Sequence, residues 1–236
     1  MKLKNIFSVP QSYKKQIKDY SLKDLFFVFL IYFLYLCAIV FSGLIIKKFP
    51  NINTIFMGTT INILFVLLVL LILKIKKEKL SSLGLQGGYL KLSLILGITL
   101  SIILFFCNCL SNIIFEHQKF IFLPKIIENI FYFLSVGLCE EILFRGYILT
   151  RLHSFTKKIM LDIIITGILF VLMHFPFRMI VYNLSFINFF CNYPYIIDLF
   201  ITHCILTFIR IRSDNIYGSI LPHWISDFSY SIVSHI

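Results

Sequence analysis

Long apolar segments separated by short polar ones dominate the pattern of hydrophobic and polar positions along the chain. A helix that crosses a bilayer needs about 20 consecutive, mostly apolar residues. Several segments reach about that length. The candidate spans are residues 25–46, 54–73, 90–115, 127–149, 159–176, 194–211 and 217–236. The pattern therefore predicts an all-α fold, a polytopic transmembrane helix bundle.

One further apolar stretch, residues 177–193, leaves the number of spans open between seven and eight. It is short, and it contains one arginine and three asparagines. A stretch of this kind either crosses the membrane or lies as a helix at its surface. Seven spans are favoured, because Arg210 and Arg212 then share a side with the other basic flanks.

Basic residues at the ends of the spans predict the orientation of the bundle. The polar segment 1–24 carries six lysines, four more close the second span, and a further group lies between the fourth and fifth spans. Cytoplasmic flanks are enriched in lysine and arginine. We therefore expect a multi-pass cell-membrane protein with a cytoplasmic N-terminus. The six N-terminal lysines are Lys2, Lys4, Lys14, Lys15, Lys18 and Lys23, and the later group is Arg145, Arg151, Lys157 and Lys158.

Composition supports a membrane protein and narrows its partners. The 236-residue chain is 59% apolar and 14% charged, with a mean hydropathy of +0.91, whereas soluble domains carry about 45–50% apolar and about 25% charged residues. A secreted domain and a disordered chain are thereby excluded. The net charge of +11 would otherwise suggest nucleic acid, but the basic residues are span flanks. We expect a lipid bilayer as partner, no nucleic acid, and one integral membrane domain over residues 1–236.

The fourth span contains the most costly polar residues of the chain. Each ionisable side chain inside a bilayer costs about 2.5–3.5 kcal/mol on insertion scales, yet Glu140, Glu141 and Arg145 all lie here. Glu141 and Arg145 are four residues apart, so they share a helix face and can pair. Glu140 points about 100° away and has no partner on its own helix, which makes it a candidate general base. The alternative is an ion-paired cluster that only locks helices together.

Two later spans carry further ionisable residues. His174 lies near the end of the fifth span, where a lone histidine is usually a packing residue. In the last span His223 and Asp227 are four residues apart, so Asp227 can hold one nitrogen of His223 and aim the other; a helix-packing bond is the alternative. Asp198 and His203 either line the same site or form a local pair. The shared explanation is a polar cavity in the C-terminal half of the bundle.

At these residues the sequence resembles the CPBP membrane protease family, also called the Abi family, which includes CAAX proteases and bacteriocin-processing enzymes. Three motifs carry the resemblance, in the family's order. They are two glutamates and an arginine (Glu140, Glu141, Arg145), a phenylalanine and a histidine (Phe170, His174), and a histidine and an aspartate (His223, Asp227). The resemblance covers roughly residues 80–236. It implies a catalytic core over 81–236, and it leaves 1–80 as a cytoplasmic tail and two accessory spans.

The resemblance implies an intramembrane endopeptidase with these residues in its active site. Glu140 would activate a water molecule, and His174 would help to position it. Glu141 and Arg145 would be a supporting pair, and His223 and residue 227 would face the oxyanion. An ionised aspartate only accepts hydrogen bonds, so Asp227 is either protonated or orients His223, and the second reading is favoured.

No cofactor is expected, and zinc is the main alternative. Two histidines and a glutamate could hold zinc with an open fourth position, but the usual HExxH helix is absent. The substrate would be a membrane-associated peptide or protein. In a bacterium the role would be peptide or bacteriocin processing or self-immunity.

Two other functions compete with the protease. One is a non-catalytic membrane scaffold or immunity protein, although every motif position is filled. The other is a small ion-coupled transporter that uses the buried charges as an ion path. The first half of the chain has no matching set of charges, which disfavours a transporter built from repeats.

Overall fold

A computed structural model describes residues 10–17, 20–85 and 88–234 of the chain. The N-terminal lysines Lys2, Lys4 and Lys18 lie outside these residues. Each long apolar segment forms a helix, because in hydrocarbon a helix satisfies all of its backbone hydrogen bonds internally. The predicted all-α transmembrane bundle is confirmed.

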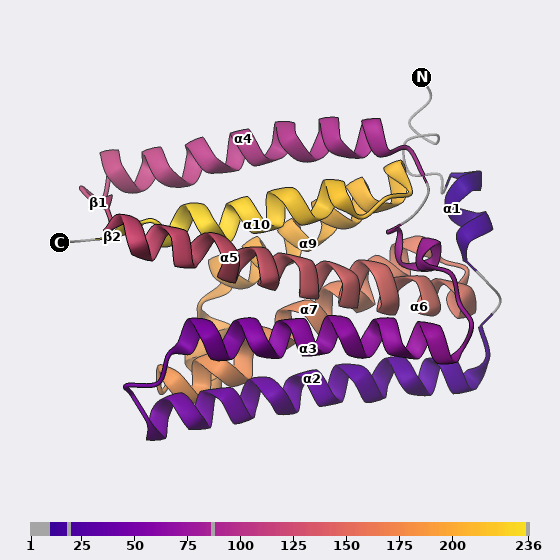
Figure 1. The fold of residues 1–236 in the computed structure, drawn as a ribbon, viewed down its shortest axis with the longest axis horizontal. Helices are drawn as coiled ribbons and strands as arrows, with labels where there is room; N and C mark the ends of the chain where they lie inside the picture. Colours follow the sequence, from indigo (N-terminus) through magenta and orange to yellow (C-terminus); the bar gives the residue numbers. More distant parts are fainter. Residues whose placement is uncertain (1–9, 18–19, 86–87, 235–236) are drawn as a thin grey trace.

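The helices follow one another through short connections (Figure 1). The α-helices are α1 (Gln11–Gln16), α2 (Leu22–Lys48), α3 (Thr54–Ile75), α4 (Leu90–Ile114), α5 (Leu123–Glu140), α6 (Leu149–Thr156), α7 (Ile159–Val181), α8 (Phe186–Cys191), α9 (Tyr193–Ser213) and α10 (Tyr217–Ser231). A 3₁₀ turn, η2 (Leu80–Leu83), precedes α4. A π-helical segment, η3 (Glu141–Ile148), joins α5 to α6 without a break.

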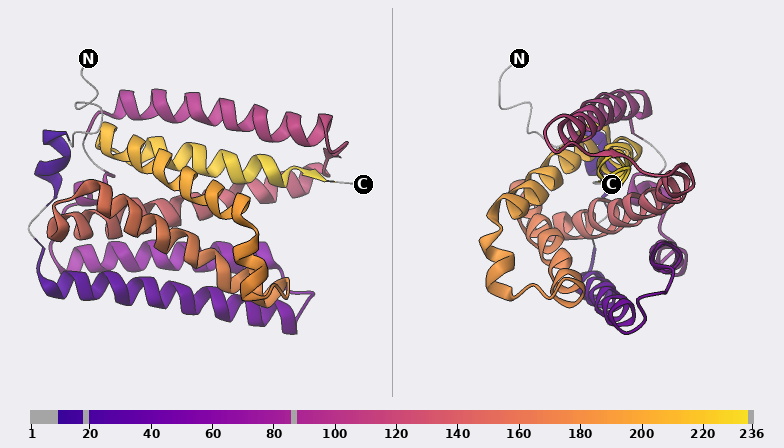
Figure 2. Two further views of the ribbon diagram at one scale, coloured as in Figure 1. Left: turned by 180° about the vertical axis from the view of Figure 1, so that it is seen from behind. Right: turned by 90° about the vertical axis from the view of Figure 1, so that its left-hand side faces the viewer.

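The long helices lie side by side and alternate in direction (Figures 1 and 2). Five of the described helices are long and apolar enough to cross a membrane, namely α2, α3, α4, α7 and α9. The continuous rod of α5, η3 and α6 and the shorter α10 run alongside them (Figure 1). Helix α10 lies between α4 and α5 and packs on both.

The stretch that left the span number open, residues 177–193, does not form a span of its own. Helix α7 continues through Pro176 to Val181, where the predicted fifth span ended at 176, and it is followed by a turn and the six-residue α8. A proline inside a membrane helix is tolerated because neighbouring groups satisfy the freed backbone positions. The segment is too short to cross again, so the eight-span alternative is not supported.

The last predicted span is shorter than expected. Helix α10 ends at Ser231, and the chain then forms β2 (Val233–Ser234), which pairs antiparallel with β1 (Lys119–Phe120). This two-stranded pairing ties the end of α10 to the connection before α5.

The largest apolar core surrounds η3. Side chains of α2, α3, α5, α7 and α10 pack against it, and every residue of η3 is buried. The charged residues at the start of η3 are therefore enclosed by protein.

Candidate active site

The two adjacent glutamates lie where the rod changes from α-helix to π-helix. Glu140 is the last residue of α5, and Glu141 is the first of η3. Glu141 is fully buried, and Glu140 is 7% exposed. Single π-helical turns inside α-helices occur frequently at functional sites. The junction thus places two carboxylates in the protein interior, on neighbouring positions of one rod.

Glu141 forms the ion pair that the four-residue spacing predicted. Arg145 Nη1 lies 2.9 Å from Glu141 Oε1, and both side chains are fully buried. The contact is an ion pair without a well-aligned hydrogen bond. The guanidinium carbon of Arg145 also lies 4.5 Å from the centre of the Phe170 ring of α7. Arg145 is therefore held between a carboxylate of its own rod and an aromatic ring of the next helix.

His223 of α10 joins both glutamates. Its Nδ1 lies 2.7 Å from Glu141 Oε1. An ionised carboxylate only accepts hydrogen bonds, so Nδ1–H is the donor. On the other side of the ring, Nε2 lies 3.5 Å from Glu140 Oε2. One imidazole thus bridges the two carboxylates, although they point away from each other on their own helix.

The position of Asp227 corrects one prediction. We expected Asp227 to hold one nitrogen of His223 and aim the other. Instead Glu141 holds Nδ1, while Asp227 Oδ2 lies 3.7 Å from Nε2, the nitrogen that also faces Glu140. The four-residue spacing does put both side chains on one face of α10, but a carboxylate from the facing helix approaches more closely. The Asp227 side chain is 36% exposed, so it marks the open side of the cluster.

His174 of α7 has a fixed tautomer. Its Nδ1 lies 2.8 Å from the carbonyl oxygen of Phe170. A carbonyl only accepts hydrogen bonds, so Nδ1 carries the proton and Nε2 of the neutral ring is an acceptor. The ring centre lies 5.0 Å from that of Phe170 and 6.5 Å from that of Tyr195. His174 therefore presents the lone pair of Nε2, and two aromatic side chains pack against its ring.

Phe170 brings the three motifs together, a role that the analysis of single residues missed. Its ring lies under Arg145 and packs at 5.0 Å from His174 and at 6.0 Å from His223, measured between ring centres. The available signal was the second motif itself, in which Phe170 precedes His174 by four residues. Tyr195 of α9 had no signal in the sequence, because its place beside His174 depends on how α7 and α9 pack.

His203, on α9, lies next to this cluster and does not pair with a carboxylate of its own helix. His203 is buried, its ring centre is 5.4 Å from that of Phe170, and its Nε2 lies 3.0 Å from Thr166 Oγ1. Asp198 is exposed on the same helix. The sequence left open whether Asp198 and His203 line the site or form a local pair. In the structure His203 borders the polar cluster, and its local pair with Asp198 is not formed.

The residues considered for zinc are not arranged as a ligand set. Among residues 10–17, 20–85 and 88–234, no three His, Cys, Asp or Glu side chains are grouped so that they could hold a metal ion. The imidazole of His223 is engaged by Glu141 through Nδ1.

Comparison with known proteins identifies the part of the chain that holds this cluster. Residues 121–229 match the model of the Rce1-like type II CAAX prenyl endopeptidase family. The matched segment runs from just before α5 to near the end of α10, and it contains all six candidate residues. No curated protein and no solved structure matched the chain. Residues 121–229 of this multi-pass membrane protein are thus similar to the Rce1-like type II CAAX prenyl endopeptidase family, in line with the CPBP resemblance that the three motifs carry.

Proposed function

We propose that the protein is a membrane-embedded endopeptidase that hydrolyses a peptide bond of a membrane-associated peptide or protein with a water molecule activated by Glu140. The Rce1-like segment supports a protease-like function within the membrane. The observation that carries the finer proposal is the bridge made by His223, which contacts Glu141 at 2.7 Å and faces Glu140 at 3.5 Å. This bridge gives the two chemically similar carboxylates, Glu140 and Glu141, different roles.

Glu140 is the general base of this proposal. It is buried but not in an ion pair with Arg145, and its Oε2 makes no hydrogen bond to a described residue. In the first step Glu140 takes a proton from water while the water oxygen bonds to the scissile carbonyl carbon. In the second step the carbon–nitrogen bond breaks, and Glu140 returns the proton to the leaving amine. The products are a carboxylic acid and an amine, and Glu140 ends as an ionised carboxylate, as it began.

Glu141, Arg145 and His223 supply the electrostatic part of the reaction. The ion pair with Arg145 keeps Glu141 charged, and Glu141 holds Nδ1–H of His223. With a proton on Nε2 as well, the imidazolium donates a hydrogen bond to the oxyanion of the tetrahedral intermediate. A single oxyanion donor is worth about 100- to 1000-fold in rate. Glu141 is thus a positioning residue, whereas His223 contacts the reacting atoms.

His174 helps to place the attacking water. Its Nε2 is an acceptor because Nδ1 donates to the Phe170 carbonyl, so a water hydroxyl can donate to it while the water oxygen faces the substrate. The tautomer is set by the backbone of α7, one helical turn earlier, and does not depend on the substrate.

We further propose that the protein lies in the cell membrane with its N-terminus in the cytoplasm. The start of α2, the ends of α3, α6 and α9, and the start of α10 all lie at one end of the bundle (Figure 1). Most of the lysines and arginines flank these points, which fits the enrichment of basic residues on the cytoplasmic side. In a bacterium such an enzyme would process peptides or bacteriocins or confer self-immunity.

Cleavage of a library of membrane-associated peptides by the purified protein in detergent tests the proposal. Glu140→Gln removes the base and keeps the shape of the side chain. Glu128→Gln is the matched control, because Glu128 is an exposed glutamate on the same helix, α5. We expect cleavage by wild type and Glu128→Gln and none by Glu140→Gln. Equal cleavage by all three proteins would remove Glu140 from the mechanism.

The two competing functions, a scaffold or immunity protein and a transporter, predict different results for wild type, Glu128→Gln and Glu140→Gln. A scaffold or immunity protein would keep its cellular phenotype in the Glu140→Gln variant, because the fold is retained. A transporter would carry ions across proteoliposomes in the absence of any peptide. Loss of the phenotype together with loss of cleavage supports the protease.

A further inference from the structure

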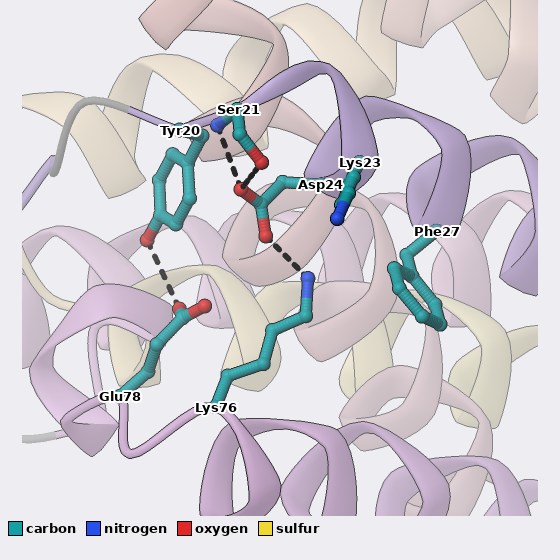
Figure 3. A pocket seen from close by; sticks show the side chains of 7 residues that line it. All are labelled: Tyr20, Ser21, Lys23, Asp24, Phe27, Lys76 and Glu78. Carbon is teal, nitrogen blue, oxygen red and sulfur yellow. Dashed lines mark hydrogen bonds and ion pairs between the residues drawn. The ribbon is translucent and has the colours of Figure 1, made fainter.

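A second polar site lies at the end of the bundle where α2 begins and α3 ends (Figure 3). It is a pocket with a volume of about 340 Å³, outside the Rce1-like segment. Both signs of charge and two aromatic rings line it. The lining side chains that the argument uses are Tyr20, Lys23, Asp24, Phe27, Lys76 and Glu78.

Part of this pocket is a fixed frame. Lys76 forms an ion pair with Asp24, and its ammonium lies 4.3 Å from the centre of the Phe27 ring. The second oxygen of Asp24 accepts hydrogen bonds from the backbone N–H of Ser21 at 2.7 Å and from the Ser21 hydroxyl at 2.8 Å. Asp24 is thereby saturated, and the ring of Phe27 is already occupied by a cation.

Two charged groups of the pocket remain available. Lys23 is exposed, and no described residue pairs with its ammonium, which points over the pocket in Figure 3. Glu78 uses one oxygen, Oε2, for the Tyr20 hydroxyl at 3.2 Å and for Arg151 Nη2 at 2.5 Å. Burial raises the pKa of Tyr20 to about 12, so its hydroxyl stays a donor. The other oxygen of Glu78 faces the pocket (Figure 3).

In a bilayer that α3 spans, the pocket would lie at the depth of the lipid headgroups. The hydrocarbon core of a bilayer is about 30 Å thick, which about 20 helical residues span, and α3 has 22 residues and ends one position before Lys76. Large apolar side chains next to the pocket are exposed on the outer faces of both helices, namely Leu22, Phe26, Leu71 and Ile75. A molecule with acyl chains along this surface would have its headgroup at the pocket.

We propose that this pocket binds the headgroup of a phospholipid that carries both a phosphate and a primary ammonium group. The phosphate would contact the ammonium group of Lys23, and the lipid ammonium would donate to the free oxygen of Glu78. The lining residues contribute two positive and two negative charges, so each charge of a zwitterionic headgroup would meet a group of opposite sign.

The chemistry of the pocket also distinguishes between zwitterions. A primary ammonium donates hydrogen bonds to a carboxylate, whereas a quaternary ammonium has no N–H and is usually recognised by faces of aromatic rings. Here the Phe27 ring already faces Lys76, while a carboxylate oxygen is free. Ethanolamine-type headgroups are therefore favoured over choline-type ones.

Native mass spectrometry of the full chain, released from nanodiscs, tests the proposal. The probes are nanodiscs of equal parts phosphatidylethanolamine, phosphatidylcholine and phosphatidylglycerol with the same acyl chains. Lys23→Gln removes the free ammonium without breaking a contact among the described residues, and Lys23→Arg retains a cation. Lys79→Gln is the control, because Lys79 is an exposed lysine nearby that does not line the pocket.

We expect wild type, Lys23→Arg and Lys79→Gln to retain phosphatidylethanolamine over the other two lipids by about tenfold, the preference expected for one charge-assisted hydrogen bond. Lys23→Gln should lower the retention of phosphatidylethanolamine and phosphatidylcholine together, because both headgroups carry the phosphate that Lys23 contacts, and it should keep the ethanolamine preference that Glu78 provides. Equal retention of the ethanolamine and choline lipids by wild type would overturn the proposal. So would a preference for phosphatidylglycerol, or an equal loss in Lys79→Gln, because both indicate general attraction to basic residues. Peptide cleavage plays no part in this experiment, so its outcome is independent of the proposed protease activity.

Discussion

Three carboxylates surround one imidazole in this protein, and their burial differs. Glu141 is fully enclosed with Arg145, Glu140 is nearly enclosed without an ion pair to an arginine, and Asp227 lies at the open side. Breaking a buried ion pair by removing one partner costs about 3–5 kcal/mol, because a charge is left uncompensated. The structure therefore gives Glu141 a buried counter-charge on its own helix and gives Glu140 none.

This difference gives a stability prediction. Glu141→Gln should lower the free energy of unfolding by about 3 kcal/mol, because Arg145 loses its buried counter-charge. The double variant Glu141→Gln with Arg145→Met should recover part of that loss, since no unpaired charge remains. Denaturant unfolding of the purified proteins in detergent measures both. A wild-type stability for Glu141→Gln alone would contradict the assigned ion pair.

Asp227 gives a prediction about rate. An ionised aspartate near the oxyanion only accepts hydrogen bonds, whereas an asparagine can donate one. Asp227→Asn should keep at least the wild-type cleavage rate, and Asp227→Ala should reduce it, because His223 loses the polar side chain that faces its Nε2 at 3.7 Å. The rates are measured with one peptide under single-turnover conditions. A greater loss for Asn than for Ala would show that the negative charge itself is required.

The sequence predicted contacts within a helix and missed contacts between helices. The pair of Glu141 and Arg145 follows from a four-residue spacing, and the structure has it. The bond of Glu141 to His223 joins residues 82 positions apart, and no local periodicity encodes it. For the same reason Asp227 was expected to be the partner of His223, since it was the nearest candidate along the chain.

At the scale of elements, the sequence predicted which segments form helices, but it did not predict where a helix continues beyond its expected end. The apolar segments located the spanning helices, because length and hydropathy are local properties. The continuation of α7 through Pro176 and the π-helical η3 between α5 and α6 were not visible in the pattern. Both depend on how neighbouring helices satisfy or displace backbone hydrogen bonds.

Close packing of α4 against α10 gives a prediction at this scale. A Cβ added at Gly218 of α10 would overlap the backbone oxygen of Ser93 in α4, and the Gly218 N–H donates to the Ser93 hydroxyl at 2.8 Å. Gly218→Ala should separate the two helices, destabilise the protein by about 1–3 kcal/mol and displace His223.

Gly43→Ala in α2 is the control for this substitution. A Cβ there would lie 3.3 Å from atoms of the Ile180 side chain, which can adjust, so we expect a smaller change. Thermal unfolding in detergent and peptide cleavage are compared for the two variants. Equal effects would show that the contact of α4 with α10 has no special role in placing His223.

At the scale of the whole molecule, the arrangement of the helices predicts where each end of the chain lies. The N-terminal α1 and the end of α10 are at opposite ends of the bundle (Figure 1). An odd number of passes follows from this, in keeping with the seven spans that the sequence favours. If the N-terminus lies in the cytoplasm, as we propose from the basic residues, the C-terminus should be outside.

Reporter fusions after Ile236 test this arrangement. Alkaline phosphatase, which needs the oxidising exterior for its disulfides, should be active there, and a fluorescent protein that folds only in the cytoplasm should be dark. A second pair of fusions after Lys158 should give the reverse. A fluorescent C-terminal fusion would contradict seven passes with a cytoplasmic N-terminus.

The central claim is that Glu140 activates the water that cleaves the peptide bond. Its most direct test is the single-turnover rate for one cleaved peptide, measured with wild type before and after chelation and with Glu140→Gln. Loss of a general base lowers the rate of a reaction by about 10²- to 10⁴-fold. We therefore expect Glu140→Gln to cleave the peptide more slowly by about that factor, and chelated wild type to cleave it at an unchanged rate. A Glu140→Gln variant that cleaves at the wild-type rate would contradict the account. Loss of activity on chelation with recovery on adding zinc would contradict it in favour of a metalloprotease.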